Sequence, residues 1–195
     1  SLPTVLSNER FARLVARFSE ANPALRLEID LDDRPVNPVA AQVDLAIRIG
    51  DPGDDARLAR RLFVTRGIVV TGSGGADAIS VPADLETRVW LRSPAARDRL
   101  PLVRLKDGRR SEIAPQRQIV VNDAAMIRTL LSQTGGFALF PEFTVREAIA
   151  GGGLVHVLPG WGVPDIPVTA LYTERRTSLS NARGFVAAVE RELRG

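Results

Sequence analysis

The sequence predicts an α/β fold, because amphipathic helical segments alternate with short apolar strands from one end of the chain to the other. The clearest helix covers residues 7–21, where apolar side chains recur three and four residues apart, and it must end before Asn22-Pro23. Residues 25–31 and 43–49 alternate apolar with polar side chains, which predicts two strands that each bury one face. A second regular helix closes the chain, and its apolar stripe consists of Ala182, Phe185, Val186, Val189 and Leu193.

The elements between these landmarks are shorter. Asn122 or Asp123 is the natural N-cap of a middle helix, and Pro141 opens another. The polar segments 92–100 and 106–116 are expected to be loops. Short apolar runs predict strands at residues 68–70, 89–91, 102–105, 119–121, 137–140, 154–158 and 168–172.

Composition argues against most enzyme classes. The 195 residues suffice for one large domain or two small lobes, and no apolar run reaches the roughly 18 residues of a membrane span. Cysteine is absent and His156 is the single histidine, so thiolate or histidine metal sites and catalytic triads are not expected. The segment Gly72-Ser-Gly-Gly75 lacks the lysine of a phosphate-binding loop. We therefore expect a binding module with no catalytic residue, no metal and no cofactor.

The charge pattern favours a solvated surface over a nucleic-acid-binding face. Net charge is +3, and 25 of the 26 basic residues are arginine. These arginines are spread from Arg10 to Arg194 among 23 acidic residues, with only short pairs such as Arg109-Arg110. A nucleic-acid-binding surface normally gathers its basic residues on one face or arm.

Several phrases, in order along the chain, resemble a known family. They are Ser1-Leu-Pro3 with the helix that ends in Arg17-Phe18, Asp44-Leu-Ala-Ile-Arg-Ile-Gly50, Gly136-Phe-Ala-Leu-Phe-Pro141 and Pro159-Gly-Trp161. Together they resemble the effector-binding domain of LysR-type bacterial transcription regulators over nearly the whole chain. The chain departs from the family's usual pattern at Arg13, at Thr134 and in the segment 74–78.

The resemblance implies a two-lobe fold like that of type 2 periplasmic solute-binding proteins. Lobe one would contain residues 1–71 and 172–195, lobe two residues 72–171, and two crossing strands near 68–71 and 168–172 would form the hinge. The family's N-terminal winged helix-turn-helix would be absent from this chain. The implied function is ligand sensing in a cytoplasmic regulator that is not an enzyme. The implied partners are a small-molecule effector, a second copy of the chain (a homodimer, and a tetramer at full length) and DNA only through the missing domain, with no membrane partner.

The expected effector site follows from the fold class. In open α/β sheets ligands lie beyond the carboxyl ends of strands, where helix N-termini favour polar or anionic groups. Each residue there also has a structural alternative: helix capping for Thr4, Asn122 and Asp123, and turn formation for the glycines. The candidate residues are Ser1, Thr4, Gly50, Asp51, Thr71, Gly72, Asn122, Asp123, Phe140 and Pro141, with the last two as an apolar wall.

Two other functions share this fold. A solute-binding protein of a transport system would normally carry an export signal or a lipid-anchor cysteine, and neither is visible in the sequence. A transferase would need a cofactor-binding cysteine or a convergent acid/base pair, which the sequence does not show. The regulator is therefore the first expectation and the transport protein the alternative.

Overall fold

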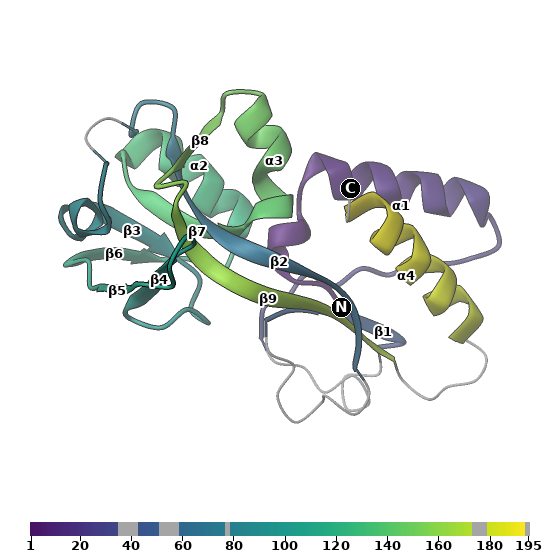
Figure 1. Cartoon of the computed structure of the whole chain (residues 1–195). Helices are drawn as coiled ribbons and strands as arrows, with labels where there is room; N and C mark the ends of the chain where they lie inside the picture. Colours follow the sequence, from purple (N-terminus) through teal and green to yellow (C-terminus); the bar gives the residue numbers. More distant parts are fainter. Residues whose placement is uncertain (35–42, 51–58, 77–78, 173–178, 194–195) are drawn as a thin grey trace. The chain divides into compact units, whose positions relative to one another are not determined.

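The computed structural model describes residues 1–34, 43–50, 59–76, 79–172 and 179–193. The chain forms two compact units: unit 1 contains residues 1–64 and 166–195, and unit 2 contains residues 65–165. The chain passes between the units twice, within the long strands β2 (Ala59–Gly72) and β9 (Trp161–Tyr172), both visible in Figure 1.

Two helices pack together in unit 1. Helix α1 (Glu9–Ala21) is capped by Asn8, whose side-chain oxygen accepts a 3.0 Å hydrogen bond from the Phe11 amide, and it ends before Asn22-Pro23 as predicted. Helix α4 (Leu179–Leu193) provides Phe185, whose ring meets those of Phe11 and Phe18 edge-on at centroid distances of 6.3 and 5.1 Å. The apolar stripes read from the sequence therefore form the contact between these two helices.

Strand β1 (Leu45–Ile49) confirms the strand predicted over residues 43–49, and it pairs antiparallel with the end of β9. Ala46 and Ile47 are buried. A short 3-10 helix, η1 (Thr4–Leu6), precedes α1.

The strand predicted over Leu25–Leu31 is wrong. The segment forms no regular strand, and only Leu31 makes an isolated parallel bridge, with Leu2. Ile29 and Leu31 are 41% and 42% exposed, so the alternation does not bury one face. Alternation predicts a strand only where a neighbouring strand can pair with it. Among the described residues, Leu2 is the single partner for this segment.

The parallel part of the unit 2 sheet consists of three strands. β3 (Val89–Arg92) pairs in parallel with β6 (Arg117–Val120) on one side and with β7 (Phe137–Pro141) on the other. β2 runs antiparallel both to β7 and to β8 (Leu154–Val157). The helices of this unit are η3 (Pro82–Thr87), α2 (Ala124–Thr134) and α3 (Glu142–Ala150).

A hairpin of β4 (Leu100–Arg104) and β5 (Arg110–Ile113) completes unit 2. The sequence placed a loop over residues 106–116, and this expectation is wrong for β5. The segment Arg110–Ile113 is a strand because it pairs with β4, with Ile113 buried opposite Leu100. Its polar side chains are largely exposed to solvent, so they do not oppose strand formation. The buried centre of the unit includes Trp90 and Phe137, whose rings stack at 6.2 Å. No helix in the described part of the chain is long and apolar enough to cross a membrane.

Candidate functional site

Unit 1 brings three chain segments to one edge in the same direction. The chain at Ser1 runs parallel to β1, because the Ser1 ammonium donates a 2.8 Å hydrogen bond to the Leu45 carbonyl and the Ser1 carbonyl accepts one of 3.0 Å from the Ile47 amide. The Leu2 amide donates to the Asp30 carbonyl at 2.8 Å, and the Leu2 carbonyl accepts from the Asp32 amide at 2.9 Å, so the second neighbour is parallel as well. The residues that follow these segments are Thr4, Asp33 and Gly50. They therefore leave the sheet at the same carboxyl edge, where α/β proteins place ligands.

Thr4 is buried and held by Asp33. Its backbone amide and its Oγ1 donate hydrogen bonds of 2.8 and 2.7 Å to the two carboxylate oxygens of Asp33. Thr4 is not the cap of α1, since Asn8 fills that position. Asp33 was not predicted from the sequence, because a partner 29 residues away leaves no local pattern.

Gly50 is required by its backbone conformation. Its φ is +107°, which side-chain-bearing residues rarely adopt, and its amide donates to the Pro167 carbonyl at 2.9 Å. An added Cβ would meet no atom of the described residues within 4 Å. The neighbouring Asp51 lies outside the described residues. Ser1 lies beside Arg48, whose Nη2 donates to its hydroxyl at 3.3 Å.

Unit 2 presents a matching carboxyl edge. The Val121 amide donates to the Arg92 carbonyl at 2.9 Å, which keeps the ends of β6 and β3 together. Asn122 and Asp123 follow directly, and the Asp123 Oδ1 accepts a 2.6 Å hydrogen bond from the Met126 amide. Asp123 is thus confirmed as the N-cap of α2, while Asn122 is exposed beside it. Pro141 ends the parallel strand β7 at this edge.

Arg128 places a positive charge on the inner face of α2. Its guanidinium lies 6.0 Å from the ring centroid of Phe140, which is 2% exposed. Burial lowers the pKa of Arg128, and the nearby Asp123 carboxylate opposes that shift. Arg128 was not predicted from the sequence. The available signal was a basic side chain within the apolar stripe of α2, formed by Ala124, Ile127 and Leu131.

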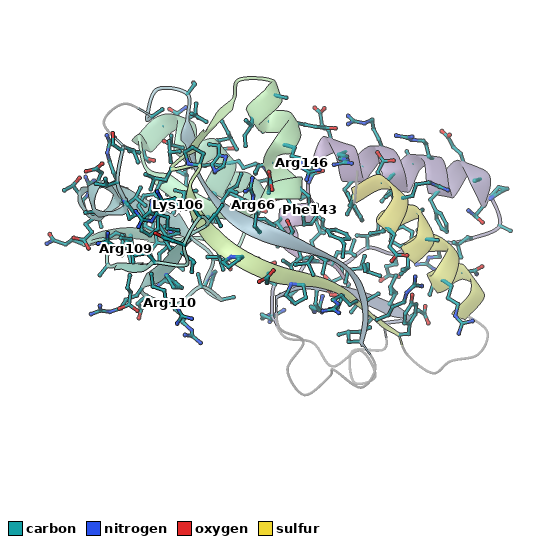
Figure 2. The ribbon with its side chains drawn as sticks, viewed as in Figure 1. Arg66, Lys106, Arg109, Arg110, Phe143 and Arg146 are labelled. Atoms are coloured by element: carbon teal, nitrogen blue, oxygen red, sulfur yellow. The ribbon has the colours of Figure 1, made fainter. Side chains whose placement is uncertain are left out.

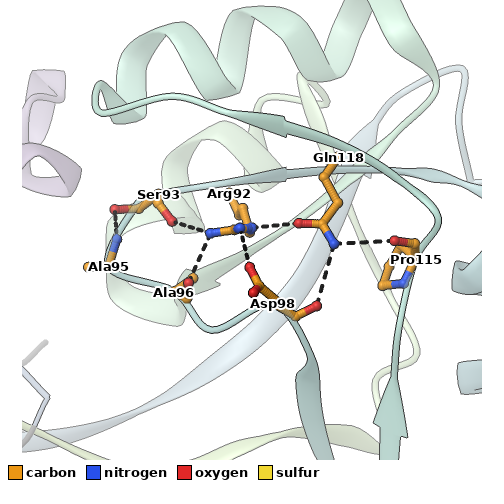
Figure 3. A network of polar contacts seen from close by, with 7 residues as sticks. All are labelled: Arg92, Ser93, Ala95, Ala96, Asp98, Pro115 and Gln118. Carbon is orange, nitrogen blue, oxygen red and sulfur yellow. Dashed lines mark hydrogen bonds and ion pairs between the residues drawn. The ribbon is translucent and has the colours of Figure 1, made fainter.

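Arg92 organises the loop after β3 (Figure 3). Its guanidinium donates to the Gln118 side-chain oxygen at 2.7 Å, to the Ala96 carbonyl at 2.9 Å and to the Asp98 carboxylate at 2.6 Å. The guanidinium carbon also lies 5.6 Å from the ring centroid of Trp90. The Arg92 side chain is only 12% exposed. These acceptors satisfy the cation, so Arg92 fixes the shape of the edge and is not an open anion site.

Thr71 and Gly72 lie at the opposite end of the unit 2 sheet. Thr71 pairs with Phe137, the first residue of β7, and its hydroxyl donates to the Gly136 carbonyl at 2.7 Å. A Cβ on Gly72 would lie 2.6 Å from the carbonyl oxygen of Leu131, near the end of α2. The structure therefore brings Asn122, Asp123, Phe140 and Pro141 to one edge and leaves Thr71 and Gly72 at the other. Among the described residues, no three His, Cys, Asp or Glu side chains are grouped so that they could hold a metal ion.

The comparisons with known proteins agree with one another. The family of LysR substrate binding domains matches residues 1–194. The HTH-type transcriptional regulator PtxR of Pseudomonas aeruginosa is 26% identical over 181 residues, which are 91% of this chain and 58% of that protein. The chain thus spans a little over half the length of the curated relatives it matches.

Solved structures show the same fold. The regulatory domain of CrgA, a LysR-type transcriptional regulator from Neisseria meningitidis, matches with a TM-score of 0.77 and 22% identity over 98% of this chain and 97% of that one. A variant of the regulatory domain of AphB from Vibrio vulnificus matches with a TM-score of 0.77 and 20% identity over 97% and 96% of the two chains. The chain therefore has the two-lobe, type 2 periplasmic-binding-like fold that its resemblance implied.

Proposed function

Because the chain belongs to the family of LysR substrate-binding domains, we propose that it senses a small polar or anionic effector on behalf of a LysR-type transcription regulator. The relatives and similar structures are transcription regulators, which favours this function over solute binding for transport. The family is one of regulators, and the proposed activity needs no catalytic group or cofactor. In the whole protein, a winged helix-turn-helix outside this chain would read DNA in the cytoplasm.

The observation that carries the proposed effector site is the shared edge in each unit. Thr4 and Gly50 follow parallel segments in unit 1, while in unit 2 Asn122 follows the parallel strand β6 and Pro141 is the last residue of the parallel strand β7. We propose effector contacts at each edge: Ser1, Thr4 and Gly50 in unit 1, and Asn122, Asp123 and Pro141 in unit 2, with Phe140 as an apolar wall of unit 2. Asp51, which the sequence also suggested, lies outside the described residues. Thr71 and Gly72 instead have structural roles at the far end of the unit 2 sheet.

An anionic group fits the unit 2 edge best. The first turn of α2 offers backbone N–H groups, and Arg128 adds a positive charge on the same helix. Burial lowers the pKa of Arg128 because it disfavours the charged guanidinium, and a bound carboxylate would offset that cost. A carboxylate-bearing metabolite is therefore the effector class that we propose.

The test begins with a thermal-shift screen of carboxylate-bearing metabolites, because a ligand that binds only the folded state raises the melting temperature. The affinity of a hit is then measured by calorimetry for the parent and for Asn122→Ala. Loss of the Asn122 side chain should weaken binding by roughly tenfold, the effect of one hydrogen bond of about 1–1.5 kcal/mol.

The matched control is Gln133→Ala. Gln133 is also an exposed amide on α2, but it lies near the C-terminal end of the helix, at the end opposite Asn122. Its replacement should leave the effector affinity unchanged. Equal affinities of the parent and Asn122→Ala for a confirmed effector would show that the site lies elsewhere.

A homodimer is the second part of the proposal, with a tetramer at full length. Exposed apolar side chains at one edge of unit 2 support it, and we call them the apolar patch: Ile119 and Val120, on opposite faces of the outer strand β6, and Met126 at the start of α2. We propose that this patch meets the exposed face of α1 in a second copy, since a two-fold dimer uses each surface twice.

Sedimentation tests the dimer with two matched valine variants. Val120 and Val81 are 49% and 52% exposed in unit 2, and only Val120 belongs to the patch. Val120→Arg should shift the chain toward monomer, whereas Val81→Arg should not. A parent that stays monomeric at high concentration, or equal association by both variants, would contradict the proposed surface.

A further inference from the structure

Basic side chains are concentrated in one stretch of unit 2. Residues 88–117 contain nine basic and three acidic side chains, a net charge of +6. The whole chain carries +3, so the remaining residues together carry −3. The arginines are spread from Arg10 to Arg194, but the net positive charge of the chain therefore comes from this stretch.

The β4–β5 hairpin projects part of this charge on a fixed turn. The Arg104 amide donates to the Arg109 carbonyl at 2.8 Å, and the Gly108 amide donates to the Arg104 carbonyl at 2.9 Å. Gly108 has a φ of +73°, which the tight reversal requires. Leu100, Leu102 and Ile113 on the strands are buried and anchor the hairpin to the core of unit 2.

The one acidic residue of the turn is used internally. The Asp107 carboxylate accepts hydrogen bonds of 2.9 and 2.5 Å from the Arg104 guanidinium and one of 3.1 Å from the Arg109 amide. The Arg104 hydrogen bonds, followed by that of the Arg109 amide, lower the pKa of Asp107, so the carboxylate stays ionised and holds the turn. Arg104 also lies 5.7 Å from the ring centroid of Trp161. Asp107 therefore shapes the turn more than it neutralises it.

Lys106, Arg109 and Arg110 are left exposed around this turn, and Figure 2 labels them in one neighbourhood of unit 2. None of the described acidic side chains forms an ion pair with any of the three. We call these three residues the basic hairpin. A rigid turn that carries three exposed cations loses little conformational entropy when an anionic partner binds to it.

We propose that the basic hairpin binds the phosphate backbone of duplex DNA. Two of its three cations are arginines, whose planar guanidinium groups pair with phosphate in bidentate fashion. A transcription regulator works within reach of DNA, which makes this polyanion the partner that the charge fits best. Such contacts hold a protein in place without reading sequence. This proposal goes beyond the expectation that DNA is contacted only through the N-terminal domain, and it does not depend on the effector site.

The test is the salt dependence of DNA binding by this chain. A labelled duplex of arbitrary sequence is titrated at several salt concentrations, with fluorescence anisotropy as the readout. The hairpin variant combines Lys106→Gln, Arg109→Gln and Arg110→Gln, and it keeps Arg104 and Asp107. The slope of log affinity against log salt should fall by roughly 0.9 for each phosphate that the protein no longer neutralises, hence by about 2–3 in this variant.

The control variant removes the same charge from unit 1 through Arg26→Gln, Arg60→Gln and Arg61→Gln, which are all exposed. Its slope should change by less than about 1. Equal changes in the two variants would reduce the effect to net charge and overturn the proposal. So would absence of DNA binding by the parent at low salt, or an unchanged slope in the hairpin variant.

A polyglutamate peptide tests the alternative partner of the basic hairpin, an acidic protein. If the hairpin substitutions abolish binding of this peptide while DNA binding persists, the surface serves an acidic protein and the DNA proposal fails. Thermal melts verify that both variants fold, since none of the replaced side chains is buried. Effector affinity, measured on the same variants, should not change, so failure here leaves the proposed effector site untouched.

Discussion

Gly72→Ala is a sharp test of the packing between β2 and α2. The new Cβ would lie 2.6 Å from the Leu131 carbonyl oxygen, 2.9 Å from the Leu131 carbonyl carbon and 3.0 Å from the Cα of Ser132. All three atoms belong to backbone, so a change of rotamer cannot relieve the overlap. The strand or the helix must shift, and overpacking of this kind typically costs about 1–3 kcal/mol.

A neighbouring glycine gives a control with the opposite sign. A Cβ on Gly74 would meet no atom within 4 Å, and Gly74 is not among the glycines with positive φ. Alanine there restricts the unfolded chain without strain in the native one, which stabilises a protein by about 0.4–1 kcal/mol. The two single-methyl additions, two residues apart, should therefore change stability in opposite directions.

Urea unfolding followed by circular dichroism measures both variants against the parent. Gly72→Ala should lower the free energy of unfolding by about 1–3 kcal/mol, or the melting temperature by roughly 2–12 °C for a chain of this size. Equal stability of Gly72→Ala and Gly74→Ala would refute the close approach. If Gly72→Ala folds but no longer binds the effector, Gly72 belongs to the effector site, as the sequence analysis proposed.

Three further predictions follow from local contacts. Phe185→Ala should cost about 3–5 kcal/mol in urea unfolding, because the ring is buried against both Phe11 and Phe18; a loss below about 1 kcal/mol would contradict that packing. Asp123→Ala should cost about 0.5–2 kcal/mol through removal of the N-cap, whereas Asp123→Asn should restore most of it. Burial, and then the nearby Arg66 cation, lower the pKa of His156 in the folded chain, so the unfolded chain binds its proton first. Stability should therefore be full above about pH 6.5 and fall as the pH drops toward the folded pKa, and His156→Gln should flatten that slope because no other histidine is present.

The sequence predicted those elements whose signal is local. The helix ending before Asn22-Pro23 is correct because periodicity, capping and the proline all lie within a few residues. The segment Leu25–Leu31 carries an equally clear alternation but lacks strand partners among the described residues. Arg110–Ile113 shows the reverse case, since hydrogen bonds to β4 form a strand from mostly polar residues. In both segments, pairing with a distant part of the chain determined whether a strand formed. Such pairing cannot be predicted from a single sequence.

In the candidate site, too, local interactions could be predicted from the sequence and long-range ones could not. Asp123 was readable as a cap because the residues it serves follow it directly. Asp33 holds Thr4, and Arg92 binds Gln118, across 29 and 26 residues, so neither interaction leaves a local pattern. The separation of Thr71 from Asn122 depends on the antiparallel direction of β2 relative to β7, which follows from topology and not from residue type.

The double passage of the chain between the units has a consequence for biosynthesis. Unit 2 is one uninterrupted segment, residues 65–165, whereas unit 1 is split between residues 1–64 and 166–195. β1 pairs with the end of β9, and α1 packs against α4, so the first part of unit 1 can complete its contacts only after the last part has been synthesised. Domains fold as units and distant pairings form slowly. We therefore expect the apolar stripe of α1 to stay without its α4 partner during synthesis until residues 179–193 have been made, after the whole of unit 2.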